Sequence, residues 1–232
     1  MIAKHVHEFS KNAYRYDAHN ALQQSIADYL VAGITARAAR VVDLGCGSGA
    51  VCKRLTWNYE RFVGIDSAPF MCALHPKSDT IEVVCDDFES QEVLQAFLPC
   101  DLLISSSALQ WANDLEALLS YVATRTQEIA FAVFTDRTFQ TLYDLSGLPS
   151  FLPNAKGLME TIEQRFTCRF EIQTFELFFE DTLSLFRYIK KSGVSGGQKR
   201  LSVAQTKQLI QNYPQRHLEF EVLFVWGTPS KS

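Results

Sequence analysis

The sequence predicts an α/β fold built around a mainly parallel sheet. Three observations predict it: short apolar runs alternate with helical patterns as far as residue 134, a glycine-rich turn follows the first run, and acidic residues stand at the ends of the next two. Such alternation is typical of parallel strands joined by crossover helices that cover both faces of the sheet. Because 232 residues with 47% hydrophobic content suffice for one core, we expect a single domain over residues 1–232.

Five parallel strands are expected first, because each apolar run is short and several are β-branched. They span 40–44, 61–65, 80–85, 101–105 and 128–134. Helical patterns lie between them at 49–56, 68–75, 90–97 and 114–124. The first of these helices is expected to begin near Ser48, so that its free N–H groups face any ligand held by the preceding turn.

The chain before the first strand has a helical pattern. Leu22, Ile26, Tyr29 and Leu30 share one face, and Gly33 is a suitable stop. We expect residues 1–33 to form an N-terminal helical clasp that folds over a ligand. An ordinary amphipathic helix packed on the edge of the sheet is the alternative.

The pattern changes after Phe134. Helical stretches in 137–166 are interrupted by glycine and proline, and two helices with a Gly/Ser/Lys/Arg loop between them fill 181–212. We expect both segments to be lid elements above the carboxyl ends of the strands, where ligands bind in open α/β sheets. Strand-like runs at 169–179 and 218–226 bring the expected number of strands to seven.

The composition argues against several classes of function. The net charge of −4 disfavours general nucleic-acid binding, and no apolar run approaches the roughly 18 residues of a membrane-spanning helix. The segment Met1–His5 lacks the apolar core of a signal peptide. The six cysteines form no Cys-x-x-Cys pair and no ligand spacing with the five histidines. We therefore expect no metal site, and reduced thiols in a cytoplasmic protein.

Residues 41–49 read Val-Val-Asp-Leu-Gly-Cys-Gly-Ser-Gly and predict a cofactor site. Gly45, Gly47 and Gly49 allow a sharp turn that brings bare backbone close to a ligand. A dinucleotide site typically has Gly-x-Gly-x-x-Gly spacing and grips a pyrophosphate, which Asp43 would repel. A carboxylate there suits the cationic amino acid end of S-adenosylmethionine. A nicotinamide cofactor and a tight turn without any ligand are the alternatives.

Acidic residues after the next two runs complete the predicted cofactor site. Asp66 stands 21 residues after Gly45, where an acidic side chain can accept hydrogen bonds from both ribose hydroxyls. At the end of the third run, an aspartate, preferably Asp87, could accept the adenine amino group, and Phe88 could cover the ring. A solvated turn is the alternative there. The predicted cofactor-binding residues are Asp43, Gly45, Cys46, Gly47, Gly49, Asp66, Ser67, Asp86, Asp87, Phe88 and Ser105.

The fourth run ends at Ser105-Ser106-Ser107, where methyl donor and acceptor should meet. Small side chains at this point leave room for the transferred methyl group. Trp111 follows within a turn or so and could form a wall of the acceptor pocket, with Gln110 beside it. Alternatively, Trp111 anchors the following helix to the sheet.

With these features the chain resembles the malonyl-carrier-protein O-methyltransferases of biotin synthesis, which are class I S-adenosylmethionine-dependent methyltransferases. The similarity covers nearly the whole chain. It is carried by residues 9–17 with Leu22-Gln23, 43–49, 105–115, 178–193 and 201–214. The resemblance implies a Rossmann-like, seven-stranded sheet whose last strand inserts antiparallel, with helical lid insertions.

The resemblance also implies the reaction, namely methyl transfer from S-adenosylmethionine to the free carboxylate of malonyl-acyl carrier protein, which makes a primer for pimeloyl synthesis. A carboxylate is already a nucleophile at neutral pH, so neither a general base nor a metal is required. It does need an orienting cation or hydroxyl, for which we predict Tyr16 and Arg187 as catalytic residues. The predicted substrate-binding residues are Lys11, Gln110, Trp111, Lys190 and Lys191.

The expected partner is an acidic carrier protein, which would dock on a local basic patch. Its members are Lys190, Lys191, Lys199 and Arg200, although a solvated loop would have the same composition. Three other functions stay open from the sequence: a methyltransferase for another small acid or metabolite, a nicotinamide-dependent oxidoreductase, and a binding module without catalysis. An intact set of Asp43, Gly45, Gly47 and Asp66 argues against the last two.

Overall fold

The computed structural model describes residues 17–192 and 202–231. Residues 1–16 of the predicted N-terminal clasp, with Lys11 and Tyr16, therefore lie outside the described residues, and so do Lys199 and Arg200.

The sheet has seven strands in the order β3-β2-β1-β4-β5-β7-β6. The first five are parallel and the last two antiparallel to their neighbours, which confirms the predicted fold, including the insertion of the last strand. Their bounds are β1 Arg40–Leu44, β2 Arg61–Ile65, β3 Ile81–Val84, β4 Cys100–Ser106, β5 Thr126–Phe134, β6 Phe166–Phe178 and β7 His217–Pro229. β1 and β4 are apolar and buried almost throughout, as expected of central parallel strands with both faces covered.

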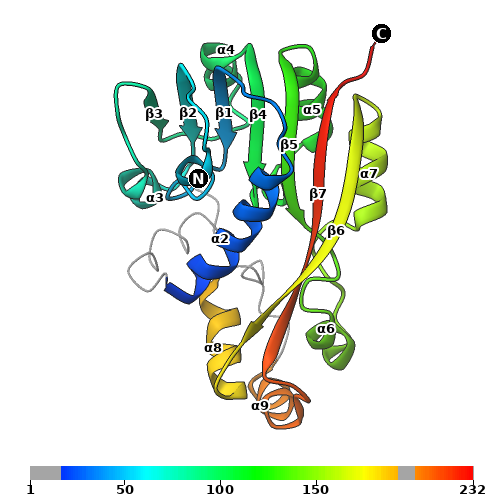
Figure 1. Cartoon of the computed structure of the whole chain (residues 1–232). Coiled ribbons are helices and arrows are strands. Elements are labelled where there is room, and N and C mark those ends of the chain that lie inside the picture. Colours follow the sequence, from blue (N-terminus) through cyan, green and yellow to red (C-terminus); the bar gives the residue numbers. More distant parts are fainter. Residues whose placement is uncertain (1–16, 193–201, 232) are drawn as a thin grey trace.

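Helices cover both faces of the sheet (Figure 1). They are α2 Asp17–Ala32, α3 Pro69–Leu74, α4 Gln91–Phe97, α5 Leu115–Ala123, α6 Gln140–Ser146, α7 Ala155–Glu163, α8 Thr182–Ser192 and α9 Val203–Asn212, with short 3₁₀ turns η2 Cys52–Arg54 and η3 Leu109–Trp111. α2 crosses one face of the sheet, and α4, α5 and α7 pack on the other. Each face of the sheet therefore has its own buried apolar cluster, because the helices between successive strands pack on both faces.

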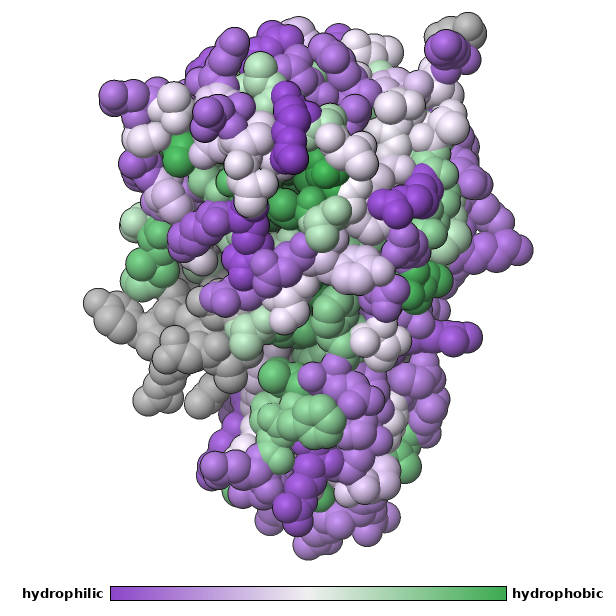
Figure 2. Space-filling model, viewed as in Figure 1, coloured by the Kyte–Doolittle hydropathy of each residue, from purple (hydrophilic) through white to green (hydrophobic). Residues whose placement is uncertain are grey.

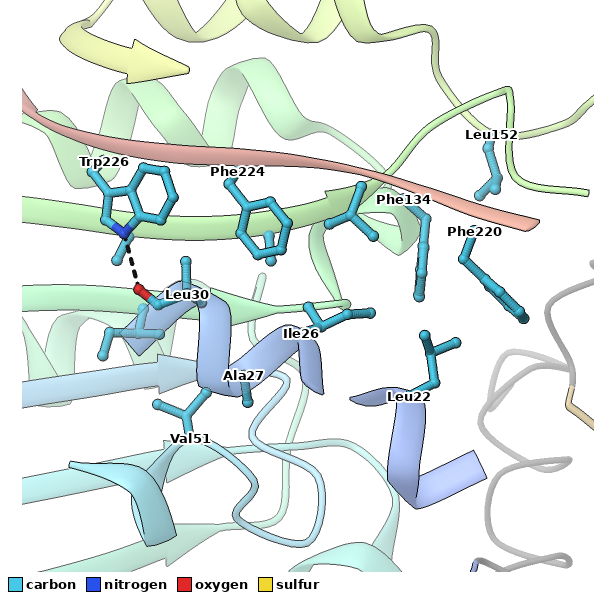
Figure 3. Close-up of a cluster of buried hydrophobic side chains, with 14 of the residues drawn as sticks. Leu22, Ile26, Ala27, Leu30, Val51, Phe134, Leu152, Phe220, Phe224 and Trp226 are labelled. Carbon is cyan, nitrogen blue, oxygen red and sulfur yellow. Dashed lines mark hydrogen bonds between the residues drawn. The ribbon is translucent and has the colours of Figure 1, made fainter. Parts of the chain in front are cut away.

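The cluster under α2 explains why this helix ends where the sequence predicts. Leu22, Ile26 and Leu30 are buried against β5 and β7 (Figure 3). The indole Nε1 of Trp226 donates a hydrogen bond to the backbone oxygen of Leu30 at 3.0 Å. A Cβ at Gly33 would lie 2.3 Å from the Trp226 ring, so only glycine fits where the helix stops.

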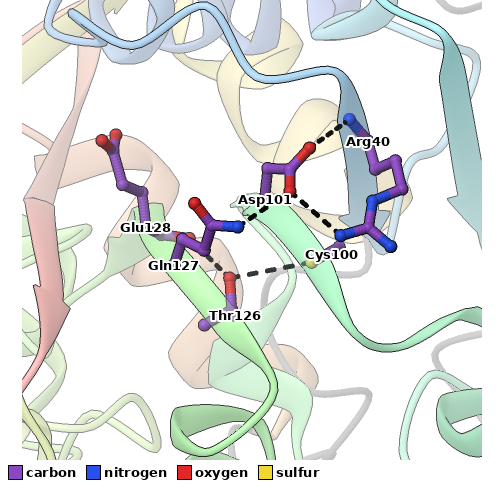
Figure 4. A network of polar contacts seen from close by, with 6 residues as sticks. All are labelled: Arg40, Cys100, Asp101, Thr126, Gln127 and Glu128. Carbon is purple, nitrogen blue, oxygen red and sulfur yellow. Dashed lines mark hydrogen bonds and ion pairs between the residues drawn. The ribbon is translucent and has the colours of Figure 1, made fainter.

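A polar network ties the amino ends of β1, β4 and β5 together, at the end of the sheet opposite the predicted site (Figure 4). The Asp101 carboxylate accepts from the backbone N–H of Arg40 at 2.8 Å, from its guanidinium at 3.2 Å and from Gln127 at 3.0 Å. Although partial burial raises the pKa of Asp101, the Arg40 hydrogen bonds and charge hold it below its ordinary value. The network therefore fixes three strands relative to one another.

The helix predicted at 49–56 is wrong. The chain forms turns there and then the single 3₁₀ turn η2. Gly47 and Gly49 have φ of +53° and +84°, which keeps the chain out of the right-handed helical region before η2. After η2 the backbone of Leu55 is extended, and the indole of Trp57 donates to the Ala38 oxygen at 3.0 Å. The segment is thus fixed at both ends as a compact loop.

β6 and β7 are longer than the sequence patterns indicated, because they pair without interruption from Phe166↔Pro229 to Phe178↔His217. Figure 1 shows this ribbon running past the carboxyl ends of β4 and β5, where α6, α8 and α9 also lie. The surface on this side is mostly hydrophilic, with apolar side chains gathered near α8 (Figure 2). In the part of the chain that the structure describes, no helix is both long and apolar enough to cross a membrane.

Candidate active site

A cleft lies at the carboxyl ends of β1, β2 and β4, the edge at which open parallel sheets bind ligands. It is bounded by the glycine turn after β1, by the start of α3, by the turn after β4 and by one residue of α2. The lining residues are Gln23, Asp43, Gly45, Cys46, Gly47, Ser48, Ala50, Val51, Asp66, Ser67, Ala68, Met71, Phe88, Ser106, Ser107, Ala108 and Trp111.

The glycine turn is held so that its backbone faces the cleft. The N–H groups of Gly45 and Cys46 both donate to the Ile65 oxygen, at 2.8 and 3.0 Å, which anchors the turn to the end of β2. Gly45 has φ +72°, and a Cβ there would lie 2.1 Å from the Cβ of Ala108. The turn thus packs directly against the segment after β4, which no larger residue at position 45 would allow.

The side-chain carboxylate of Asp43 has no hydrogen-bond partner among the described residues, although Asp43 is 1% exposed and lines the cleft. Both carboxylate oxygens are buried and unpaired. Burial, with a smaller contribution from the charge of Asp66, raises the pKa of Asp43 to about 8. A buried carboxylate in this state requires either a proton or a cationic ligand. The cleft therefore has a position that an ammonium group would satisfy.

Asp66, at the end of β2, is already hydrogen-bonded to backbone. Its Oδ2 accepts from the N–H of Gly47 at 2.9 Å, and its Oδ1 accepts from Ala68 at 2.8 Å. Burial raises the pKa of this carboxyl, and the two backbone N–H groups oppose the rise. Each carboxylate oxygen has a second lone pair, so the side chain can still accept from a ligand hydroxyl.

The turn after β4 differs from the expectation for Ser105. That side chain is fully buried, its hydroxyl donates to the Leu44 oxygen at 2.8 Å, and it does not line the cleft. The next two residues, Ser106 and Ser107, do. Ser105 instead ties β4 to β1, and its cofactor contact stays a prediction.

Gln110 and Trp111 have different places in the same turn. Trp111 lines the cleft and stacks on Phe151, a residue between α6 and α7, with ring centroids 5.8 Å apart at 25°. Gln110 is not among the lining residues, and its Nε2 donates to the Ser107 oxygen at 2.7 Å. Trp111 thus joins the cleft to the expected lid segment, and Gln110 supports the turn.

The remaining predicted residues that the structure describes are not among those that line the cleft. Gly49 belongs to the loop, and its close neighbours are Pro76 and His75. Asp86 and Asp87 are exposed after β3 and bind backbone N–H groups nearby. Arg187 and Lys190 are exposed on α8, where Lys191 also lies. Their ligand contacts stay predictions.

Several lining residues were not predicted as ligand contacts. Gln23 reaches the cleft because α2 crosses the sheet, and its signal in the sequence is the Leu22-Gln23 pair that contributes to the family resemblance. Met71 lies in α3, and Ala68 is the residue before it, whose N–H donates to the Asp66 carboxylate. Among the described lining residues the ionisable acids are Asp43 and Asp66, and none is Lys, Arg or His. The described residues include no group of three or more potential metal ligands.

Comparisons with known proteins identify a methyltransferase. Residues 41–128 match the family described as "Methyltransferase domain". A malonyl-[acyl-carrier protein] O-methyltransferase of Acetivibrio thermocellus is 28% identical, with 88% of this chain and 83% of the relative covered. Those of Anoxybacillus flavithermus and Salmonella typhimurium are 26% and 25% identical, covering 91% and 93% of this chain and 88% and 91% of the relatives.

Solved structures show the same fold at low sequence identity. The YcgJ protein from Bacillus subtilis has a TM-score of 0.65 at 13% identity, covering 90% of this chain and 99% of its own. The plantazolicin methyltransferase BamL, solved in complex with SAH, has a TM-score of 0.51 at 15% identity, covering 96% of this chain and 91% of its own. The chain is therefore a class I S-adenosylmethionine-dependent methyltransferase, and along most of its length it is similar to the malonyl-[acyl-carrier protein] O-methyltransferases.

Proposed function

We propose that this enzyme methylates the free carboxylate of malonyl-acyl carrier protein, giving the malonyl methyl ester that primes pimeloyl synthesis for biotin. The observation that carries the proposal is the similarity to malonyl-[acyl-carrier protein] O-methyltransferases, which extends over about nine tenths of the chain and so includes the segments beyond the cofactor cleft.

The residues of the cleft fit S-adenosylmethionine. Asp43 offers two unpaired buried oxygens to an ammonium group, and the close packing of Gly45 on Ala108 leaves bare backbone facing the ligand. Asp66 suits the ribose hydroxyls, and Phe88, which also lines the cleft, suits the adenine ring. When bound, S-adenosylmethionine supplies an electrophilic methyl group on a sulfonium sulfur, and no metal is part of the proposal.

The chain's own residues have a limited chemical task in this reaction. The acceptor carboxylate is ionised at neutral pH, so no side chain has to remove a proton. The cleft must hold the carboxylate in line with the methyl group, and well-oriented intramolecular reactions gain roughly 7–11 kcal/mol from such positioning. Trp111, stacked on Phe151, provides a rigid apolar wall for this purpose.

The lid is part of the proposal. Residues 137–166 and 181–212 would close over the cleft together with the N-terminal clasp, and would exclude water from the meeting point of carboxylate and sulfonium. The contact between Phe151 and Trp111 supports this, because Phe151 belongs to residues 137–166 and Trp111 lines the cleft. The position of α6, α8 and α9 at the carboxyl end of the sheet supports it too.

The carrier protein would dock on α8. Acyl carrier proteins are acidic, and Lys190 is an exposed cation on α8. Arg187, predicted to orient the malonyl carboxylate, is a second exposed cation about one helical turn away. Lys191, Lys199 and Arg200 would extend this patch. A cytoplasmic location completes the proposal and is supported by the six cysteines, which are all free thiols.

The test is transfer of labelled methyl from S-adenosylmethionine to malonyl-acyl carrier protein, with malonyl-coenzyme A and free malonate as parallel acceptors. We expect the carrier-protein thioester to be labelled in preference to the other two. Label only in a small acid would replace the carrier-protein substrate by a small-molecule one. Binding of the cofactor without transfer to any of the three would overturn the proposed reaction while leaving the methyltransferase fold in place.

A further inference from the structure

The turn after β4 holds Ser107 in a conformation that is rare for a residue with a side chain. Its φ is +62°, in the left-handed region. Hydrogen bonds fix both of its backbone groups: the N–H donates to the Ala132 oxygen at 2.8 Å, and the carbonyl accepts from Nε2 of Gln110 at 2.7 Å. Such strain persists only where the surroundings impose it, and it is concentrated at functional sites.

The hydroxyl of Ser107 is buried and has no hydrogen-bond partner in the part of the chain that the structure describes. Ser107 also lines the cleft, between Ser106 and Ala108. A buried hydroxyl without a partner is costly, and a ligand in the cleft could supply the missing partner. The Oε1 of Gln110 is likewise buried and unpaired, so the turn has two unsatisfied polar atoms in addition to those of Asp43.

The other polar groups of the cleft indicate which ligand this is. The cationic end of the cofactor has a counter-charge in Asp43, and the ribose has an acceptor in Asp66. The acceptor molecule brings a carboxylate, and none of the described lining residues is Lys, Arg or His. A neutral hydroxyl is therefore a suitable donor for it. Ser107 is also well placed, because Ala108 packs on Gly45 of the cofactor turn and Trp111 follows in the same segment.

We propose that Ser107 is an acceptor-binding residue whose hydroxyl donates a hydrogen bond to a carboxylate oxygen of the malonyl group, with Gln110 as the positioning residue that holds the turn. This inference rests on the proposed function and assigns a residue to its acceptor site. No bond to Ser107 forms or breaks, and the hydroxyl keeps its proton while the methyl group passes to the other carboxylate oxygen.

The test compares Ser107→Ala with Ser107→Gly. Both remove the hydroxyl, but glycine also relieves the left-handed strain and so protects the fold. We expect both variants to lower kcat/KM for malonyl-acyl carrier protein by about tenfold or more, the usual range for a hydrogen bond to a charged group. We expect the dissociation constant for S-adenosylhomocysteine, measured by calorimetry, to stay within about twofold of the wild-type value.

Three outcomes would overturn the assignment. If the wild-type enzyme methylates the carrier-protein substrate and both variants do so equally well, Ser107 does not bind the acceptor. If Ser107→Gly is fully active and only Ser107→Ala is impaired, the hydroxyl is not needed for activity and does not bind the acceptor. If the affinity for S-adenosylhomocysteine falls by as much as kcat/KM, the hydroxyl serves the cofactor. An inactive wild-type enzyme would instead overturn the proposed function, and this assignment with it.

Discussion

The backbone N–H of Gly47 donates to Oδ2 of Asp66 at 2.9 Å, so the glycine turn after β1 is fastened by the acidic residue at the end of β2. The same carboxylate accepts from the N–H of Ala68, the residue directly before α3. Asp66 therefore shapes the cleft as well as being available to a ligand. A change at this residue has two consequences, and they can be measured separately.

Replacing Asp66 by Ala should weaken S-adenosylmethionine binding by at least about tenfold, because it removes a ribose acceptor and releases the glycine turn. It should also destabilise the fold, since the N–H groups of Gly47 and Ala68 lose their acceptor. Calorimetry and thermal unfolding report the two effects. The matched control is Asp101→Ala, which breaks the network at the far end of the sheet and should lower stability without changing cofactor affinity. Unchanged affinity in the Asp66 variant would remove it from the ribose role.

Asp43 should make the stability of the unliganded enzyme fall with rising pH. Its pKa is raised to about 8 in the folded state, whereas an unfolded chain has the ordinary value of about 3.9. Between these values the folded state holds a proton that the unfolded state has lost, so the free energy of unfolding decreases as pH rises from about 4 to about 8. Asp43→Asn should remove this contribution. Urea titrations of both proteins across this range test it, and parallel pH profiles would contradict it.

Cofactor binding should release a proton through the same residue. At pH 7 a carboxyl with a pKa of about 8 is mostly protonated, and an ammonium group placed beside it favours the ionised form. Calorimetric titration with S-adenosylhomocysteine in two buffers of different ionisation enthalpy should therefore show release of up to about one proton. Asp43→Asn should bind more weakly and release none. Equal observed enthalpies in the two buffers for the wild-type enzyme would rule out this linkage.

Gly45→Ala should abolish cofactor binding and destabilise the protein, since the new Cβ would lie 2.1 Å from the Cβ of Ala108. Gly147→Ala is the matched control. That glycine also has a positive φ, of +66°, but a Cβ there meets nothing within 4 Å. The control should lose only about 1–2 kcal/mol of stability to backbone strain and keep its cofactor affinity. Similar behaviour of the two variants would show that the contact with Ala108 does not matter.

Arg187→Ala should raise the apparent KM for malonyl-acyl carrier protein and leave S-adenosylmethionine affinity unchanged. Arg187 is exposed on α8 and does not line the cleft, so a docking role predicts that malonyl-coenzyme A, tested beside it, is not affected. Loss with both acceptors would favour direct contact with the malonyl carboxylate after lid closure. Lys156→Ala, which removes an exposed lysine on α7, is the control. Kinetics equal to the wild type with both acceptors would exclude both roles for Arg187.

Local patterns predicted the central sheet well. The runs at 40–44 and 61–65 match β1 and β2 at both ends, because each is a short buried strand bounded by turn residues. The residue types at 49–56 are compatible with a helix, and for that reason the sequence predicts one there. The structure has a loop there, because Gly47 and Gly49 have positive φ angles and the indole of Trp57 is hydrogen-bonded to the Ala38 oxygen. Contacts that are distant in sequence overrode local preference there.

By itself, the sequence determined the parallel sheet, the cofactor turn and the acidic residues Asp43 and Asp66, because these depend on backbone freedom and residue spacing within one strand–turn unit. Only the tertiary structure decided which serines at the end of β4 line the cleft, since the burial of Ser105 against Leu44 and the left-handed turn at Ser107 depend on neighbouring strands. It also decided that Gln23 reaches the cleft and that both Asp43 oxygens are unpaired. A sequence pattern gives only the residue types. Whether a polar atom has a hydrogen-bond partner depends on all the groups that surround it in the folded chain.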